Sequence, residues 1–148
     1  MADTGAIQKL REQTGAGLVV CKKALDEAGG DVEKAIAILH EKGMAKVEKT
    51  AGRSAGAGSI SSYVHNERVG VLLDLRAETD FVVRSEPFKQ LAREIALQIA
   101  AMGGETVEEV LEQPYIKDPN RKVADLVNDV IARVGEKVQI NKFFRLEV

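Results

Sequence analysis

A glycine-rich run at residues 51–58 divides the chain between two different hydrophobic periods. Before this run, apolar residues recur every three or four positions, which is the spacing of an amphipathic helix. After it, apolar and polar residues alternate, which is the spacing of a half-buried strand. Small residues without a pattern favour a flexible connection. The sequence therefore predicts a helical domain over residues 1–51, a linker over 52–58 and an α+β core domain over 59–148.

Three short helices are predicted in the first domain. Breaks at residues 14–17 and at the glycine pair 29–30 separate them. Asp31 is a suitable N-cap for the third helix, because its carboxylate can accept backbone N–H groups. Lys42 and Gly43 are typical of a helix end, so we expect the third helix to stop there. The positions on the apolar faces of the three helices are Ile7, Leu10, Leu18, Cys21, Leu25, Ala28, Ala35, Ile36 and Leu39.

The second domain begins with a predicted hairpin. Alternation over residues 60–65 indicates one strand, and alternation over 69–75 indicates the next, with a turn at 65–68 between them. Two adjacent strands with a short connection are expected to pair in antiparallel fashion.

Helices and a last strand follow. Ser85 and Pro87 mark the start of a long helix that the glycine pair 103–104 ends. Shorter helices are predicted over residues 106–113 and 123–134. A final strand is expected to present one apolar face, made of Val138, Ile140, Phe144, Leu146 and Val148.

The predicted fold class is α+β: a three-helix bundle, then a small three-stranded antiparallel sheet with helices on one face. Such a sheet has an uncovered face and exposed edges, which are liabilities unless something pairs with them. We therefore expect a homodimer that forms through the sheet of the core domain.

Composition excludes several classes of function. The formal net charge is −2, whereas a protein that coats nucleic acid needs clustered positive charge. The chain has one cysteine, and no secretory signal or long apolar run is recognisable, so we expect a cytoplasmic protein away from membranes. We find no phosphate-binding loop, no zinc-ligand spacing and no activated nucleophile, which predicts a protein without cofactors, directly bound nucleotide or covalent chemistry. Cys21 is expected to be a buried small apolar residue, and His40 a solvated one.

The most unusual local run spans residues 76–84, Arg-Ala-Glu-Thr-Asp-Phe-Val-Val-Arg, between a strand end and a helix start. It puts an aromatic ring beside an acid where polar turn residues are the norm. On the residues alone, Phe81 has two interpretations: it folds back into the core, or it is displayed at the tip of a loop.

Residues 78–82, Glu-Thr-Asp-Phe-Val, resemble the Thr-Asp-Phe-Val motif of the elongation factor Ts family. Residues 10–17 followed by 21–25 resemble the opening signature of that family, and residues 28–35 continue it. Runs at 63–72, 113–118 and 141–145 resemble later family segments. The likeness spans nearly the whole chain in the right order, which is more specific than any single motif.

This resemblance implies a function. The N-terminal bundle is expected to be ubiquitin-associated-like, and the chain to be a guanine nucleotide exchange factor for elongation factor Tu. Family likeness assigns Phe81 as a wedge that disturbs the Mg²⁺ site of the partner, Asp80 as its polar companion, and Thr79 and Val82 as residues that shape the tip. It assigns docking of the N-terminal domain to Leu18, Val19 and Val20, with Lys22 and Lys23 beside them.

The chain also departs from the family. Leu18, Val19 and Val20 stand where members commonly carry two methionines and an acid, so the docking contacts are expected to differ in detail. Phe144 stands where some short members carry a cysteine that links a dimer. The alternatives are a helical adaptor, whose bundle binds a protein helix or a ubiquitin-like partner without exchange activity, and an RNA-binding module. The charge balance and the lack of paired aromatic residues on a strand weaken the RNA-binding alternative.

Overall fold

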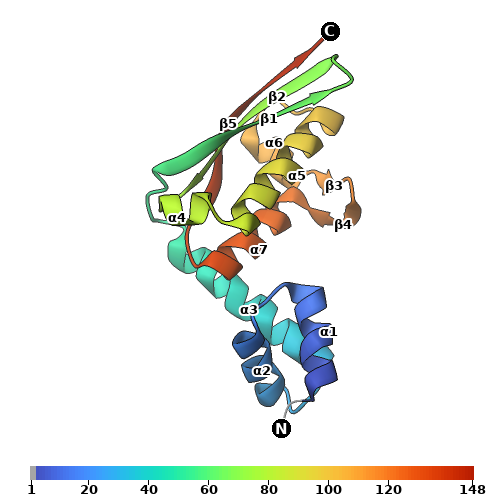
Figure 1. Ribbon diagram of the computed structural model, residues 1–148, viewed down its shortest axis with the longest axis vertical. Helices are drawn as coiled ribbons and strands as arrows, with labels where there is room; N and C mark the ends of the chain where they lie inside the picture. Colours follow the sequence, from blue (N-terminus) through green and yellow to red (C-terminus); the bar gives the residue numbers. More distant parts are fainter. Residues whose placement is uncertain (1–2) are drawn as a thin grey trace.

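The computed structural model describes residues 3–148 as a helical bundle joined to a three-stranded antiparallel sheet (Figure 1). The bundle and the sheet lie at opposite ends of the molecule, and a long helix runs between them. This arrangement confirms the predicted α+β class. The elements are α1 (Thr4–Thr14), α2 (Leu18–Glu27), α3 (Val32–Thr50), β1 (Ala57–His65), β2 (Val69–Ala77), α4 (Asp80–Val83), α5 (Glu86–Met102), α6 (Val107–Glu112), β3 (Pro114–Tyr115), β4 (Asp118–Lys122), α7 (Val123–Val134) and β5 (Val138–Glu147).

The N-terminal bundle has a small core of its own. Asp31 caps α3 as predicted, since its Oδ1 accepts a hydrogen bond from the backbone N of Lys34 at 3.2 Å. Cys21 is fully buried and His40 is exposed, as expected. The buried residues of this core are Ile7, Leu10, Cys21, Ala24, Leu25 and Ala35.

Helix α3 does not end at Gly43, so that prediction was wrong: the helix continues to Thr50. Gly43 allows close packing, because a Cβ at this position would lie only 3.0 Å from the Cβ of Ala132 on α7 and would push the two helices apart slightly. Just beyond it, Lys46 Nζ donates to the carbonyl oxygen of Ala132 at 2.8 Å. The glycine therefore marks a close approach of α3 to α7, and its cost in helix propensity is accepted for that contact.

The connection between bundle and sheet is correspondingly short. It follows Thr50 and gives way to β1 at Ala57, inside the predicted linker. Val47, near the end of α3, packs against the core beneath the sheet, so this helix contributes to both parts of the molecule. The division into residues 1–51, 52–58 and 59–148 stays a prediction.

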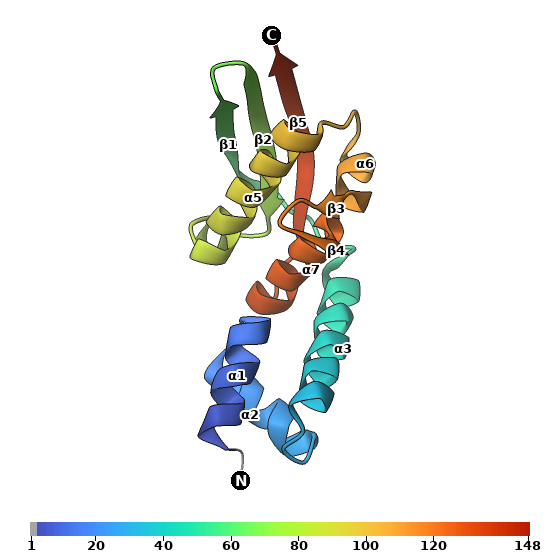
Figure 2. The same ribbon diagram turned by 90° about the vertical axis from the view of Figure 1, so that its right-hand side faces the viewer.

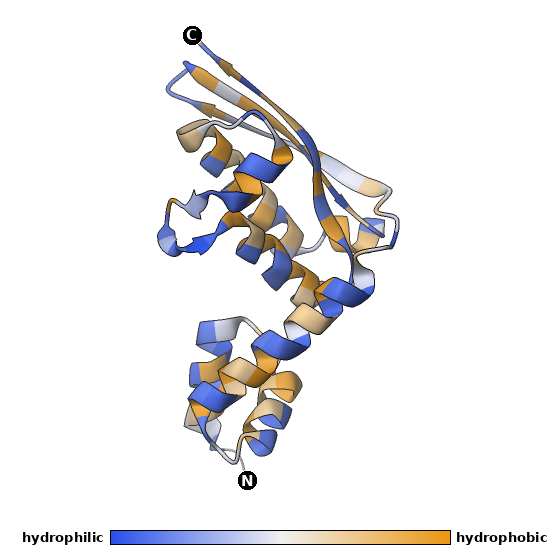
Figure 3. Cartoon of the chain, turned by 180° about the vertical axis from the view of Figure 1, so that it is seen from behind, coloured by the Kyte–Doolittle hydropathy of each residue, from blue (hydrophilic) through white to orange (hydrophobic). Residues whose placement is uncertain are grey.

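The sheet has the order β1–β2–β5, with both neighbouring pairs antiparallel. Asn66 and Glu67 lie in the three-residue connection between β1 and β2 with φ of 49° and 58°, and the backbone N of Arg68 donates to the carbonyl oxygen of His65 at 3.0 Å to close the turn. Helices α5 and α7 cover one face of the sheet (Figure 2), and apolar and polar residues alternate along the strands (Figure 3). The core between these layers includes Val71, Leu73, Leu75, Phe88, Ile95, Ile99, Val127 and Ile131.

Strand β5 contains a bulge that overturns the single apolar face expected for it. Leu75 of β2 pairs with Ile140 but Asp74 pairs with Lys142, so Asn141 is the extra residue. Val138 and Ile140, before the bulge, are buried, whereas Phe144, Leu146 and Val148, after it, point away from the helices and are exposed. One inserted residue reverses the side-chain alternation of everything that follows.

The bulge also turns Arg145 towards the helices. Its Nε donates to the carbonyl oxygen of Ile99 and its Nη2 to that of Ala100, both at 3.1 Å. These carbonyls belong to the last turn of α5, where the Ile99 carbonyl oxygen also accepts from the backbone N of Gly103 at 2.8 Å. The arginine therefore ties the outer end of β5 to the end of the long helix.

Asp74 lies beside the bulge and is only 5% exposed. Its carboxylate accepts hydrogen bonds from Arg76 Nε at 2.6 Å, Arg76 Nη2 at 3.0 Å and Asn141 Nδ2 at 2.9 Å. The hydrogen bond from Arg76 holds the pKa of the Asp74 carboxyl below its ordinary value of 3.8. The charged form is therefore favoured by folding.

We expect this carboxylate to stabilise the fold above its ordinary pKa, and this stabilisation to be lost as pH falls through the lowered value. Asp74→Asn should lower the free energy of unfolding at neutral pH by about 1 kcal/mol, the size of a partly solvated charged hydrogen bond. The deficit should shrink as the pH falls through the ordinary pKa of 3.8 towards the lowered pKa of the folded protein, because the unfolded chain then binds a proton that the folded carboxylate resists. Urea denaturation across this range, with exposed Asp26→Asn as the control, measures it; a deficit that does not change with pH would contradict the assignment.

Candidate functional site

The loop between β2 and α5 displays Phe81 on the surface. The loop contains the single-turn helix α4, and Thr79 is its N-cap, with its Oγ1 accepting from the backbone N of Val82 at 3.4 Å. The Phe81 side chain is 85% exposed, the largest exposed fraction of any large hydrophobic residue in the described part of the chain. The core-folded interpretation of this residue is therefore wrong.

Val82 behaves in the opposite way to its neighbour. Successive residues of a helical turn point about 100° apart, so Phe81 and Val82 cannot face the same way. Val82 is 5% exposed and joins the core beneath the sheet, and its carbonyl oxygen accepts from Ser85 Oγ at 2.6 Å. Among the four residues predicted for the tip, Thr79, Asp80 and Phe81 are exposed, while Val82 anchors the tip from inside.

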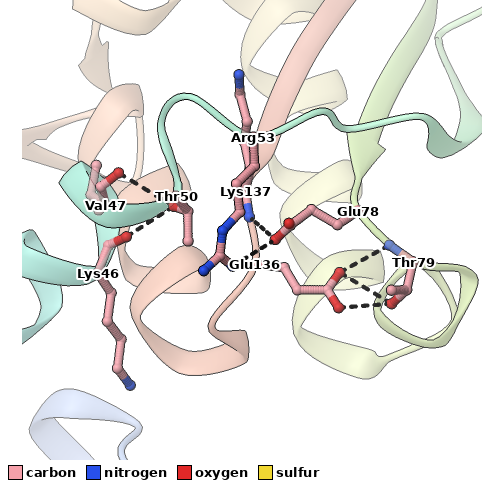
Figure 4. A network of polar contacts seen from close by, with 8 residues as sticks. All are labelled: Lys46, Val47, Thr50, Arg53, Glu78, Thr79, Glu136 and Lys137. Atoms are coloured by element: carbon pink, nitrogen blue, oxygen red, sulfur yellow. Dashed lines mark hydrogen bonds and ion pairs between the residues drawn. The ribbon is translucent and has the colours of Figure 1, made fainter.

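The base of the loop is held by the turn between α7 and β5 (Figure 4). Glu136 accepts from Thr79 twice: from its backbone N at 3.0 Å through Oε1, and from its hydroxyl at 2.8 Å through Oε2. Glu78 Oε2 accepts from the backbone N of Lys137 at 2.8 Å. Each side of this contact thus offers a carboxylate to the backbone of the other.

Sequence reasoning missed Glu136, because it lies 57 positions from Thr79. The one local signal is the helix end at Gly135, whose φ of 72° turns the chain sharply before Glu136. Nothing in that signal indicates which distant loop the glutamate contacts.

An open hollow of about 520 Å³ lies next to the tip. Gly56 and the first residues of β1 form one side of it, through residues 56–60. Asp74, Arg76 and Asp80 contribute the charged side chains of the lining. The surface around the exposed ring is therefore polar and leaves room for another molecule to approach.

The predicted docking residues lie together at the start of α2. Leu18, Val19 and Val20 are 56%, 65% and 45% exposed, although Leu18 was also expected on the buried face of this helix. Lys22 and Lys23 are exposed one turn further on. The arrangement is an exposed apolar patch next to two positive charges, which is typical of a surface that binds another protein.

The sheet face opposite the helices is a second apolar surface, which we call the outer sheet face. It is defined by exposed side chains of all three strands and of the residue that follows β5. Their exposed fractions run from 50% at Leu72 to 76% at Val148. In the register of the sheet, Ser62, Leu72 and Phe144 form one row, and Val64, Gly70 and Leu146 form another. The six apolar residues are Ile60, Val64, Leu72, Phe144, Leu146 and Val148.

Within residues 3–148, no helix combines the length and the apolar character that crossing a membrane requires.

Comparison with known proteins gives a consistent match. The family model described as "Elongation factor TS" matches residues 78–148. The chain is 41% identical to elongation factor Ts of Thermotoga petrophila and 37% identical to that of Thermodesulfovibrio yellowstonii, in each case over 96% of this chain and 94% of the relative. It is 40% identical to elongation factor Ts of Desulforamulus reducens, over 100% of this chain and 90% of that protein. The first two alignments span 186 positions, so these relatives contain segments without a counterpart in this chain of 148 residues.

Proposed function

The chain belongs to the elongation factor Ts family, and from this premise we propose that it binds elongation factor Tu and accelerates the release of GDP from it. Membership of the family makes it a translation elongation factor. In this proposal it is a guanine nucleotide exchange factor that acts in the cytosol. It neither holds nucleotide itself nor carries out covalent chemistry.

The observation that carries the proposal is the exposed ring of Phe81 on an anchored turn. A free loop with an exposed aromatic ring would lose much of its binding energy in becoming ordered. Here Val82 anchors the turn from inside, and Glu136 holds Thr79 at its base. The ring is thus presented in advance, which suits insertion into another protein.

In the proposed mechanism Phe81 enters the partner close to its bound nucleotide and displaces the elements that hold Mg²⁺. Mg²⁺ needs near-ideal octahedral geometry, so a small displacement of its supporting residues weakens phosphate binding strongly. Asp80 is the polar companion that orients the ring, and Thr79 and Val82 hold the turn.

Docking through the N-terminal bundle is the second part of the proposal. Leu18, Val19 and Val20 offer exposed apolar contacts, and Lys22 and Lys23 offer charges to an acidic rim. This contact keeps the factor on its partner while the tip acts elsewhere. If the factor lowers the affinity for GDP by some ratio, GDP lowers the affinity for the factor by the same ratio.

We also propose that two copies of the chain pair through the outer sheet face. Six exposed apolar side chains on an otherwise uncovered sheet form a patch of the kind that a second sheet covers in a sandwich. A twofold symmetric pairing is the commonest solution for such a self-complementary surface.

The purified chain is expected to accelerate the release of a fluorescent GDP analogue from elongation factor Tu, with a rate that rises and saturates as the factor is titrated. Stopped-flow fluorescence with excess unlabelled GDP measures this rate, and factor omitted from the mixture is the control. Binding without faster release would contradict exchange and favour an adaptor. No binding to elongation factor Tu at all would contradict the exchange function.

A further inference from the structure

We propose that Glu136 is a positioning residue for nucleotide exchange: it holds the Phe81 tip in the one pose that can enter the partner. This inference rests on the proposed function and adds a residue to it. Glu136 lies outside the 78–82 motif and belongs to the turn between α7 and β5.

The geometry at Thr79 carries the first step. Glu136 receives both the backbone N–H and the hydroxyl proton of Thr79, at 3.0 and 2.8 Å. With its proton directed to the carboxylate, the hydroxyl oxygen is left to accept from Val82 N at 3.4 Å, which is the N-cap contact of α4. The carboxylate therefore fixes the side chain that begins the turn, two residues before Phe81.

The second step is that the contact is reciprocal. Glu78 points the other way and accepts the backbone N–H of Lys137 at 2.8 Å, with its side chain 19% exposed. Hydrogen bonds to ionised groups are about twice as strong as neutral ones. Two neighbouring residues on each side are thus joined by carboxylate-to-backbone contacts, and this resists both twisting and sliding of the loop.

The third step is that the 135–137 turn also contacts the end of α3. Lys137 Nζ donates to the carbonyl oxygen of Ala51 at 2.8 Å. Arg53 Nη1 lies 3.5 Å from Glu78 Oε2, and Figure 4 shows these two residues beside Lys137. Helix α3 carries the N-terminal bundle with its exposed α2 patch. The 135–137 turn therefore contacts both the wedge loop and the helix that leads to the docking surface.

A role in positioning makes a specific kinetic prediction. The N-terminal bundle brings the factor to its partner whatever the pose of the tip, so the half-saturating concentration should depend little on Glu136. The maximal rate at saturation should fall with the fraction of bound factor whose tip is competent. A residue that contacts the partner directly would instead change the half-saturating concentration.

Glu136→Ala is expected to lower the maximal rate of GDP release about tenfold, the loss that corresponds to one charge-assisted hydrogen bond, with the half-saturating concentration within about twofold of wild type. Glu136→Gln keeps an acceptor oxygen for Thr79 and should recover part of the rate. Thr79→Val removes the hydroxyl contact but keeps the backbone N–H donor, and it should also slow release. The loss in the double variant should be smaller than the sum of the two single losses in free energy, because both variants remove the hydroxyl-to-Glu136 contact. The matched control is Glu112→Ala on α6, which removes the exposed ion pair between Glu112 and Lys122.

The readout is the stopped-flow release of fluorescent GDP, with circular dichroism melting curves of every variant. A wild-type maximal rate for Glu136→Ala, or losses that add in the double variant, would overturn the inference. If Glu136→Ala does not fold, the same comparison is made with Glu136→Gln and Thr79→Val, and wild-type rates for both overturn it. Phe81→Ala separates the hypotheses: if it is slow while Glu136→Ala is normal, only the positioning role fails, and if it also has the wild-type rate, the wedge assignment of Phe81 fails as well. A wild-type chain that does not accelerate GDP release at all would overturn the proposed exchange function itself.

Discussion

Phe81→Ala is expected to lower the maximal rate of GDP release from elongation factor Tu about a hundredfold, since an aromatic anchor at the centre of an interface typically contributes between about 2 and 4 kcal/mol. The fold should be preserved, because the side chain is 85% exposed and its removal leaves no cavity in the core. In the variant, Val82 still packs in the core and Thr79 still caps α4, so the turn is retained and only the exposed ring is lost.

The measurement is stopped-flow release of fluorescent GDP at saturating factor, together with a melting curve. Phe81→Tyr keeps the ring and should retain most of the rate. Met102→Ala removes an exposed apolar side chain at the end of α5, outside every proposed contact surface, and should behave as wild type. A Phe81→Ala variant that releases GDP at the wild-type rate would show that the ring is not the wedge.

The strands and helices that sequence predicted well are those whose signal is local. The stripe of α5 repeats over four turns between Ser85 and Gly103, and the β1–β2 hairpin has its turn residues directly between two alternating runs. Gly43 shows the limit of such reasoning. Its position after Lys42 is typical of a helix end, but here the glycine lies inside the helix and lets Ala132, 89 positions further along the chain, approach closely. No local pattern distinguishes these two reasons for a glycine.

The bulge at Asn141 is a second limit, with a larger consequence. Alternation in the last strand was assumed to run without interruption, which put Phe144 and Leu146 on the same face as Ile140. Beside the bulge, Asn141 Nδ2 donates a hydrogen bond to Asp74 Oδ2 of the neighbouring strand at 2.9 Å. This contact depends on the pairing of β2 with β5, which are far apart in the sequence. The sequence therefore predicts the apolar positions of the last strand correctly but places Phe144 and Leu146 on the wrong face of the sheet.

The candidate site divides in the same way. Family likeness predicts a role for residues 79–82 and the start of α2, which are short contiguous runs. It does not point to Glu136, whose proposed role depends on the turn after α7 meeting the loop after β2. A residue that acts only by holding another is invisible until the chain is folded.

The bulge leads to the second large prediction, because it turns Phe144 and Leu146 onto the outer sheet face and completes the apolar patch there. Leu72 lies in the central strand, with Ser62 and Phe144 beside it in the register. If two copies pair through this face, Leu72→Glu puts an unpaired charge into the interface from each copy. Leaving an uncompensated buried charge costs about 3 to 5 kcal/mol, so we expect the dimer to dissociate at least about a hundredfold more readily.

Light scattering coupled to size exclusion should give twice the chain mass of 16.0 kDa for wild type and the single mass for Leu72→Glu. Leu72 is 50% exposed in the single chain, so the glutamate has access to water there and the variant should stay folded as a monomer. Lys89→Glu reverses an exposed charge on α5, on the covered side of the sheet, and should remain dimeric. A wild-type chain that is monomeric at every concentration would contradict pairing, and would leave six apolar side chains facing water on a sheet that has two open edges.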